Sequence, residues 1–148
     1  MPEAILLMGS NIRPRENLSR ALKILRTLCK VTRTSDIYQT RAVGSPGPDF
    51  LNQAVIIQTN LGKEEIKKKI INPIELALHR VRVEDKYAPR TIDVDLIMLN
   101  GEVIDQNLWN QYFAAKPVSD LAPDLLHPDT RIPLQQIALQ LGEEKEES

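Results

Sequence analysis

The chain has few of the residues on which several protein classes depend. Cys29 is its single cysteine, so no disulfide can form within the chain, and a reducing compartment is expected. We interpret Cys29 as a packing residue near a helix end rather than a nucleophile. There is no long apolar run and no charged-then-apolar leader. We therefore expect a cytoplasmic protein without a membrane partner.

The net charge is close to zero, and aromatic residues are few. The chain has 19 basic and 20 acidic residues, a formal net charge of −1, and aromatic residues make up 4%. Such a balance gives no overall field that would attract nucleic acid, so an anion site has to come from local clusters of arginine. At 148 residues, we expect a single domain over 1–148, a monomer with no obligate protein partner.

Apolar periodicity and turn residues predict an alternation of strands and helices. We predict strands over 4–8, 31–40, 52–59 and 92–99, the last one turning at Asn100-Gly101 into 102–104. Helices are predicted over 14–28, from 61 to 78 with a kink or break before Pro73, and over 134–141. A long loop covers 41–49, and the acidic residues 143–148 are expected to fray. This order predicts an α+β, ferredoxin-like βαββαβ fold, a mostly antiparallel sheet with helices on one face.

The chain is organised around residues 80–99. In an extended strand Asp93 and Asp95 project to one side, about 7 Å apart, and the buried run 96–99 follows them. Acidic groups in such a strand need compensation, which Mg²⁺ could supply, and nearby arginines could then hold a polyphosphate. An Asp-x-Asp pair also fits a solvated edge or arginine partners. Arg80, Arg82 and Arg90 and the buried run favour the metal site.

The segment 89–99 (PRTIDVDLIML) closely resembles the signature of 6-hydroxymethyl-7,8-dihydropterin pyrophosphokinase, an enzyme family of the folate pathway. The resemblance continues in register over nearly the whole chain, through Gly9-Ser10-Asn11, 48–52, Ile74-Glu75, 121–125 and 127–129. It implies transfer of pyrophosphate from the co-substrate ATP to the hydroxymethyl group of a reduced pterin, with release of AMP. It also implies two Mg²⁺ ions at Asp93 and Asp95.

The resemblance assigns roles to particular positions of this sequence. The nucleotide and its polyphosphate are assigned to Asn72, Glu75, Arg80, Arg82, Arg90 and Leu96, and the catalytic set to Arg80, Arg82, Arg90, Asp93 and Asp95. The pterin is assigned to the rings of Phe50 and Phe113, the amide of Asn52, and Thr40 and Val43. Core packing is the alternative role for the two phenylalanines.

Several positions depart from the family pattern. Residues 105–113 contain no histidine and no basic residue, where the resemblance leads us to expect phosphate contacts, and Lys116 is a candidate replacement. Tyr87 stands in place of a tryptophan, the loop before Asn52 is a residue short, and His127 is interpreted as a turn residue. Because a missing phosphate donor weakens the stabilisation of the transition state, we expect slower turnover than in the family. A non-catalytic relative that binds pterin or nucleotide, and a purely structural ferredoxin-like domain, stay as alternatives.

Overall fold

Strand β1 (Glu3–Ser10) runs through the middle of the molecule because nearly every one of its residues is apolar or small. The computed structural model describes residues 2–41, 47–78 and 91–147. Strands β2 (Lys30–Thr34), β4 (Phe50–Gln58), β5 (Asp93–Leu99) and β6 (Glu102–Val103) join β1 in the order β2-β4-β1-β5-β6, and β3 (Tyr38–Thr40) pairs with β4. All described pairings are antiparallel. The predicted ferredoxin-like pattern is confirmed.

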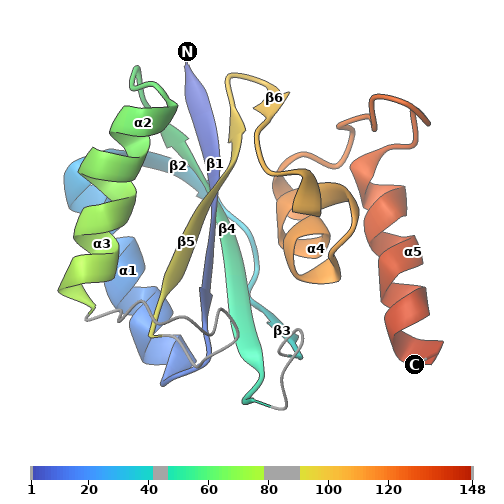
Figure 1. Ribbon diagram of the computed structural model, residues 1–148, viewed down its shortest axis with the longest axis horizontal. Coiled ribbons are helices and arrows are strands. Elements are labelled where there is room, and N and C mark those ends of the chain that lie inside the picture. Colours follow the sequence, from blue (N-terminus) through green and yellow to red (C-terminus); the bar gives the residue numbers. More distant parts are fainter. Residues whose placement is uncertain (1, 42–46, 79–90, 148) are drawn as a thin grey trace.

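Helices cover both faces of the sheet (Figure 1). On one face α1 (Pro14–Leu28), α2 (Lys63–Ile66) and α3 (Asn72–Ala77) pack against Ala4, Leu6 and Met8. On the other face α4 (Tyr112–Leu121) and α5 (Leu134–Glu147) pack against Ile5 and Leu7. The prediction of helices on one face was therefore incomplete. A strand with both sides covered is apolar throughout, as β1 is.

The helix α4 was not predicted, and α5 is longer than predicted. Pro117 lies inside α4, where a proline removes a backbone hydrogen bond and weakens the local signal for a helix. The apolar residues Ala114, Ala115 and Val118 nevertheless hold α4 against the sheet. The helix α5 extends to Glu147, and the expectation that 143–148 frays stays a prediction.

The predicted strand 31–40 is interrupted at Ser35, which separates β2 from β3. The Ser35 backbone N–H donates to the Ala54 carbonyl at 2.8 Å, and the Ala54 N–H donates to Ser35 Oγ at 2.9 Å. The hydroxyl group thus replaces a backbone carbonyl in the ladder, which lets the strand bend without leaving a buried N–H unpaired. The bend positions β3 beside the end of β4, where Thr40 pairs with Phe50.

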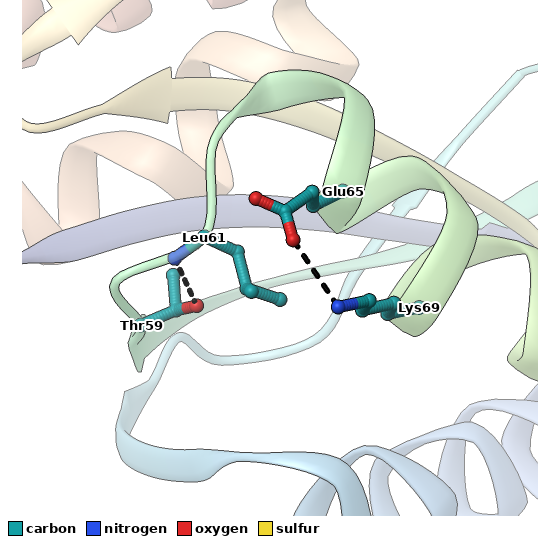
Figure 2. Close-up of polar contacts among 4 residues, drawn as sticks. All are labelled: Thr59, Leu61, Glu65 and Lys69. Carbon is teal, nitrogen blue, oxygen red and sulfur yellow. Dashed lines mark hydrogen bonds and ion pairs between the residues drawn. The ribbon is translucent and has the colours of Figure 1, made fainter.

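The irregularity expected before Pro73 takes the form of a π turn over Lys67–Ile71 (η1), between α2 and α3. Proline has no backbone N–H, so Pro73 cannot donate a hydrogen bond to the preceding helical turn. A wider π turn ahead of the proline accommodates this missing bond. In the turn that precedes α2 the Leu61 N–H donates to Thr59 Oγ1 at 3.1 Å, and Lys69 of η1 pairs with Glu65 of α2 at 3.2 Å on the exposed side (Figure 2).

The turn at Asn100-Gly101 is confirmed: both residues have positive φ, 51° and 86°, as a tight hairpin turn between β5 and β6 requires. The short β6 pairs only with Met98 and Leu99 of β5. Over the described ranges 2–41, 47–78 and 91–147, no helix is long and apolar enough to cross a membrane.

Candidate active site

A cavity of about 850 Å³ wraps around the outer edge of β5. It can do so because β6 pairs with β5 only at its far end, so that among the described strands none pairs with the outer edge at Asp93–Leu96. The residues that line the cavity come from both faces of the sheet. We call the part lined by Phe50, Asn52, Asp93, Asp95 and Phe113 the α4 side, and the part lined by Lys63, Lys67, Ile71, Glu75, Val94 and Leu96 the α3 side.

The strand β5 directs its two carboxylates to the α4 side. Val94 packs in the cluster formed with α1 and α3, whereas Ile97 packs in the cluster formed with α4 and α5. Because side chains alternate along a strand, Asp93 and Asp95 share the face of Ile97, as predicted. Asp93 lies opposite Gly9, and Asp95 lies opposite Leu7. Both carboxylates are partly exposed to the cavity.

The carboxylate pair fits a magnesium site of the kind that shares its ion with a substrate. Among the residues that the structure describes, no group of three or more histidine, cysteine, aspartate or glutamate side chains could hold a metal ion. Mg²⁺ commonly takes one or two carboxylates and fills its other positions with water and substrate phosphates. Asp93 and Asp95, two hard oxygen donors at the wall of an open cavity, satisfy that requirement.

Asn52 is held rigidly on the α4 side. Its side chain is only 4% exposed, and Nδ2 donates to Thr40 Oγ1 at 2.8 Å and to the Tyr38 carbonyl at 3.4 Å. These two bonds orient the amide oxygen Oδ1 toward Gly9 on the neighbouring strand. Phe50 and Phe113 line the same part of the cavity and are partly exposed, so they are not simply core residues.

Glu75 joins α3 to β5. It is 5% exposed, and its Oε2 accepts a hydrogen bond from the Val94 N–H at 3.3 Å. The carboxylate thus satisfies a backbone donor at the outer edge of β5, which is one structural reason for an acidic residue there. Leu96 lies next to it on the α3 side, whereas Asn72 is exposed at the start of α3 and does not line the cavity.

Four predicted residues cannot be located: Val43, Arg80, Arg82 and Arg90 lie outside the described residues, as does Tyr87. The segment before Phe113 is described. It forms a 3₁₀ turn (η2, Gln106–Trp109), and its residues Asp105, Gln106, Asn107 and Gln111 line the cavity without a basic group.

The suggested replacement, Lys116, is not at the cavity wall. Its Nζ lies 5.5 Å from the ring centroid of Tyr38, a cation–π contact on the neighbouring surface. His127 is a turn residue, as interpreted: its Nδ1 accepts hydrogen bonds from the Asp129 and Thr130 N–H groups at 3.1 and 3.3 Å. Its ring packs on Trp109 with the centroids 4.9 Å apart.

Sequence reasoning missed several cavity residues. Lys63 and Lys67 line the α3 side together with Ile71 and Glu75, a spacing of four residues each time. In a regular helix that stripe would drift around the axis, since a turn contains 3.6 residues. The wider π turn offsets the drift and keeps the lysines on the wall with Glu75. Arg41 and Gly9 also line the cavity.

The fold and the site define a class: a ferredoxin-like α+β enzyme whose cavity combines a carboxylate pair with an aromatic and amide wall. The sequence model described as 7,8-dihydro-6-hydroxymethylpterin-pyrophosphokinase (HPPK) matches residues 5–123. The chain belongs to this family. It is an ATP-dependent pyrophosphokinase of folate biosynthesis, as the sequence predicted, and nothing in the comparisons favours the non-catalytic alternative.

Relatives named 2-amino-4-hydroxy-6-hydroxymethyldihydropteridine pyrophosphokinase support the assignment. The protein from Synechocystis sp. is 32% identical over an alignment of 136 positions; the alignment covers 84% of this chain and 69% of the relative. The protein from Bacillus subtilis is 30% identical over an alignment of 154 positions; the alignment covers 96% of this chain and 91% of the relative.

Solved structures agree in fold. A Plasmodium falciparum HPPK-DHPS with STZ-DHP has a TM-score of 0.73 at 13% identity, covering 99% of this chain and 42% of that one. An HPPK-DHPS in complex with substrates has a TM-score of 0.70 at 13% identity, covering 99% and 44%. This chain therefore spans less than half the length of these structures, and at such identity the likeness concerns the fold alone.

Proposed function

We propose that the protein transfers the pyrophosphoryl group of ATP to the hydroxymethyl oxygen of 6-hydroxymethyl-7,8-dihydropterin. The hydroxymethyl oxygen forms a bond to the β-phosphorus, and the bond from that phosphorus to the oxygen bridging to the α-phosphate breaks. The products are the pterin diphosphate, AMP and a proton. The observation that carries the proposal is one cavity with two unlike sides and the carboxylates Asp93 and Asp95 on its wall.

The α4 side suits a flat heterocycle. Phe50 and Phe113 offer aromatic faces for stacking, and the immobilised amide of Asn52 can pair with the polar edge of a pterin ring. Thr40 contributes by holding that amide. A buried amide fixed in advance loses little conformational entropy when the ligand binds, which favours both affinity and specificity. Val43 is included here on the resemblance alone.

The α3 side suits the nucleotide. Leu96 and Ile71 offer apolar contacts to a base, and Lys63 and Lys67 are the cations that the described α3 side adds. Glu75 keeps the edge of β5 in place. On the resemblance, Asn72 also contacts the nucleotide, and Arg80, Arg82 and Arg90 clamp the polyphosphate. Guanidinium groups match phosphate oxygens in geometry and keep their charge.

Asp93 and Asp95 would hold the magnesium ions, two of them on the resemblance. Bound there, magnesium would offset the charge of the triphosphate and polarise the phosphoryl oxygens. The protein's own contribution is orientation: pyrophosphoryl transfer needs little covalent help, and most of the rate comes from holding acceptor and donor in line. The carboxylates lie on the wall shared with the pterin side, next to where the acceptor oxygen would lie.

One assay tests the proposal. Purified protein is incubated with ATP, Mg²⁺ and the pterin, and the nucleotides are separated by chromatography. We expect AMP in equal amount to the pterin diphosphate. Formation of ADP instead would contradict the pyrophosphoryl transfer. Tight pterin binding in calorimetry without AMP would favour the non-catalytic relative, the alternative motivated by the absence of a basic group in residues 105–113.

Location and assembly belong to the same proposal. We infer a cytoplasmic, monomeric enzyme that acts on small molecules, with residues 1–148 forming a single domain. The single Cys29 supports a reducing compartment. Sedimentation of the purified protein tests the monomer, and fractionation of cells tests the location.

A further inference from the structure

Gly9 ends the row of residues by which β1 faces the cavity, and neither its backbone nor its neighbours in the sequence explain why it is a glycine. Its φ does not lie in the left-handed region, so the conformation does not demand glycine. The next two residues have structural tasks. Ser10 Oγ donates to the Ile12 carbonyl at 3.0 Å, and Asn11 Nδ2 donates to the Pro48 carbonyl at 3.4 Å. Both shape the turn into α1.

The sheet register shows what surrounds Gly9. On one side it pairs with Asn52 of β4, and on the other with Asp93 of β5. Residues directly opposite each other on adjacent strands point to the same face, so Asn52, Gly9 and Asp93 form one row across the α4 side. The outer two lie two strand spacings apart, about 9.5 Å. Gly9 is thus a gap between the amide and the carboxylate.

A side chain at Gly9 would fill that gap. A Cβ atom there would lie 3.0 Å from Asn52 Oδ1 and 3.7 Å from Phe50 Cδ1. The first distance is shorter than ordinary van der Waals contact. Asn52 cannot yield easily, because its Nδ2 is held by Thr40 Oγ1 at 2.8 Å. A methyl group would therefore both raise the floor of the cavity and displace the amide.

We propose that Gly9 determines specificity for the pterin: its bare backbone is the floor over which the fused ring lies, between the amide of Asn52 and the carboxylate of Asp93. This inference rests on the function proposed above. A two-ring heterocycle with a one-carbon arm has the length to reach from the amide row to the carboxylate row. Phe50 and Phe113 border the same space from its sides. Glycine keeps the ring close to the sheet.

The test compares Gly9→Ala with Gly62→Ala. Gly62 is exposed, and a Cβ atom there meets nothing within 4 Å, so it is a matched glycine-to-alanine control. We expect Gly9→Ala to raise the KM for the pterin at least tenfold and to change the KM for ATP less than twofold. In Gly62→Ala both constants should stay within twofold of the unaltered protein. Unchanged pterin KM in Gly9→Ala, or equal losses for both substrates, would overturn the proposal.

A second variant covers the case in which Gly9→Ala does not fold. Combining it with Asn52→Ser removes the contact at Oδ1, and calorimetry then compares pterin binding with that of Asn52→Ser alone. At least tenfold weaker binding in the double variant is expected, and equal binding would refute the role of Gly9. The two proposals fail differently. Absence of AMP with the unaltered protein refutes the proposed reaction. If the unaltered protein is active and Gly9→Ala leaves the KM for the pterin unchanged, only the proposed role of Gly9 is refuted.

Discussion

The hydroxyl group of Tyr38 donates a 2.7 Å hydrogen bond to Asp120 Oδ2, and this bond joins β3 to α4. The same oxygen accepts a second bond from the Asp36 N–H at 3.2 Å. β3 carries Thr40, which fixes the amide of Asn52, and α4 carries Phe113. The Tyr38–Asp120 bond therefore ties together the two walls of the proposed pterin site.

This bond predicts an alkaline loss of stability. Burial first, and then the bond to Asp120 and its charge, raise the pKa of Tyr38 above its ordinary value of 10.0. Above pH 10 the unfolded chain releases this proton while the folded chain keeps it, so the free energy of unfolding falls as the pH rises. The contribution is fully present below pH 10. In Tyr38→Phe, urea unfolding between pH 8 and 11 should show a shallower decline than in the unaltered protein. Equal declines would contradict the assignment.

Thr40→Val tests the anchor of Asn52. The substitution keeps the shape of the side chain but removes the oxygen that accepts from Asn52 Nδ2. Loss of one partner of a buried hydrogen bond costs about 1–3 kcal/mol. We expect that decrease in the free energy of unfolding, together with a raised KM for the pterin and an unchanged KM for ATP.

Thr32→Val is the matched control for this substitution. Thr32 Oγ1 donates to the Ile56 carbonyl at 3.4 Å, but the residue is exposed and lies away from the cavity. Neither KM should change in this variant. If both threonine variants lower the pterin affinity to the same extent, the anchor of Asn52 is not the cause.

Much of the fold and of the geometry of the α4 side could be predicted from local signals. The β1 run, the amphipathic α1 and the Asn100-Gly101 turn each have a pattern that short stretches display on their own. The Asp-x-Asp alternation gave the correct face of β5, since side-chain direction follows strand geometry. These features depend on a residue and its near neighbours, and the sequence shows those directly.

The missed features depend on contacts between distant segments. α4 contains Pro117 and forms because tertiary packing against Ile5 and Leu7 outweighs a local helix breaker. Lys63 and Lys67 have no local signal that places them on the cavity wall, because a helix with the regular period would turn them away from Glu75. Only the π turn aligns them, and its position before Pro73 indicated an irregularity but not its geometry.

Lys67→Ala tests the α3 side. Lys67 lines the cavity, and its charge would favour a bound nucleotide tail. An exposed charge contributes about 1 kcal/mol. Removal of the Lys67 charge should therefore raise the KM for ATP about threefold to tenfold. The effect should shrink at high ionic strength, because salt screens exposed charges. The pterin KM should stay the same.

Lys68→Ala is the control on the same turn. Lys68 is also exposed and basic, yet it does not line the cavity. The two variants lose the same charge from the chain, so a general electrostatic effect would alter them equally. A rise in the ATP KM confined to Lys67→Ala supports a local contact, and equal rises would contradict it.

Asp95→Asn is the most direct test of the carboxylate pair. The amide keeps the volume of the side chain on β5, so the unfolding midpoint in urea should stay close to that of the unaltered protein. A neutral amide is a poor magnesium ligand compared with a carboxylate, and the charge stabilisation attributed to a bound metal is several kcal/mol. We therefore expect AMP formation to fall at least about 100-fold. Asp124→Asn, an exposed carboxylate outside the cavity, should leave the rate unchanged. An Asp95→Asn enzyme that forms AMP at the original rate would show that the carboxylates of β5 do not take part in the transfer.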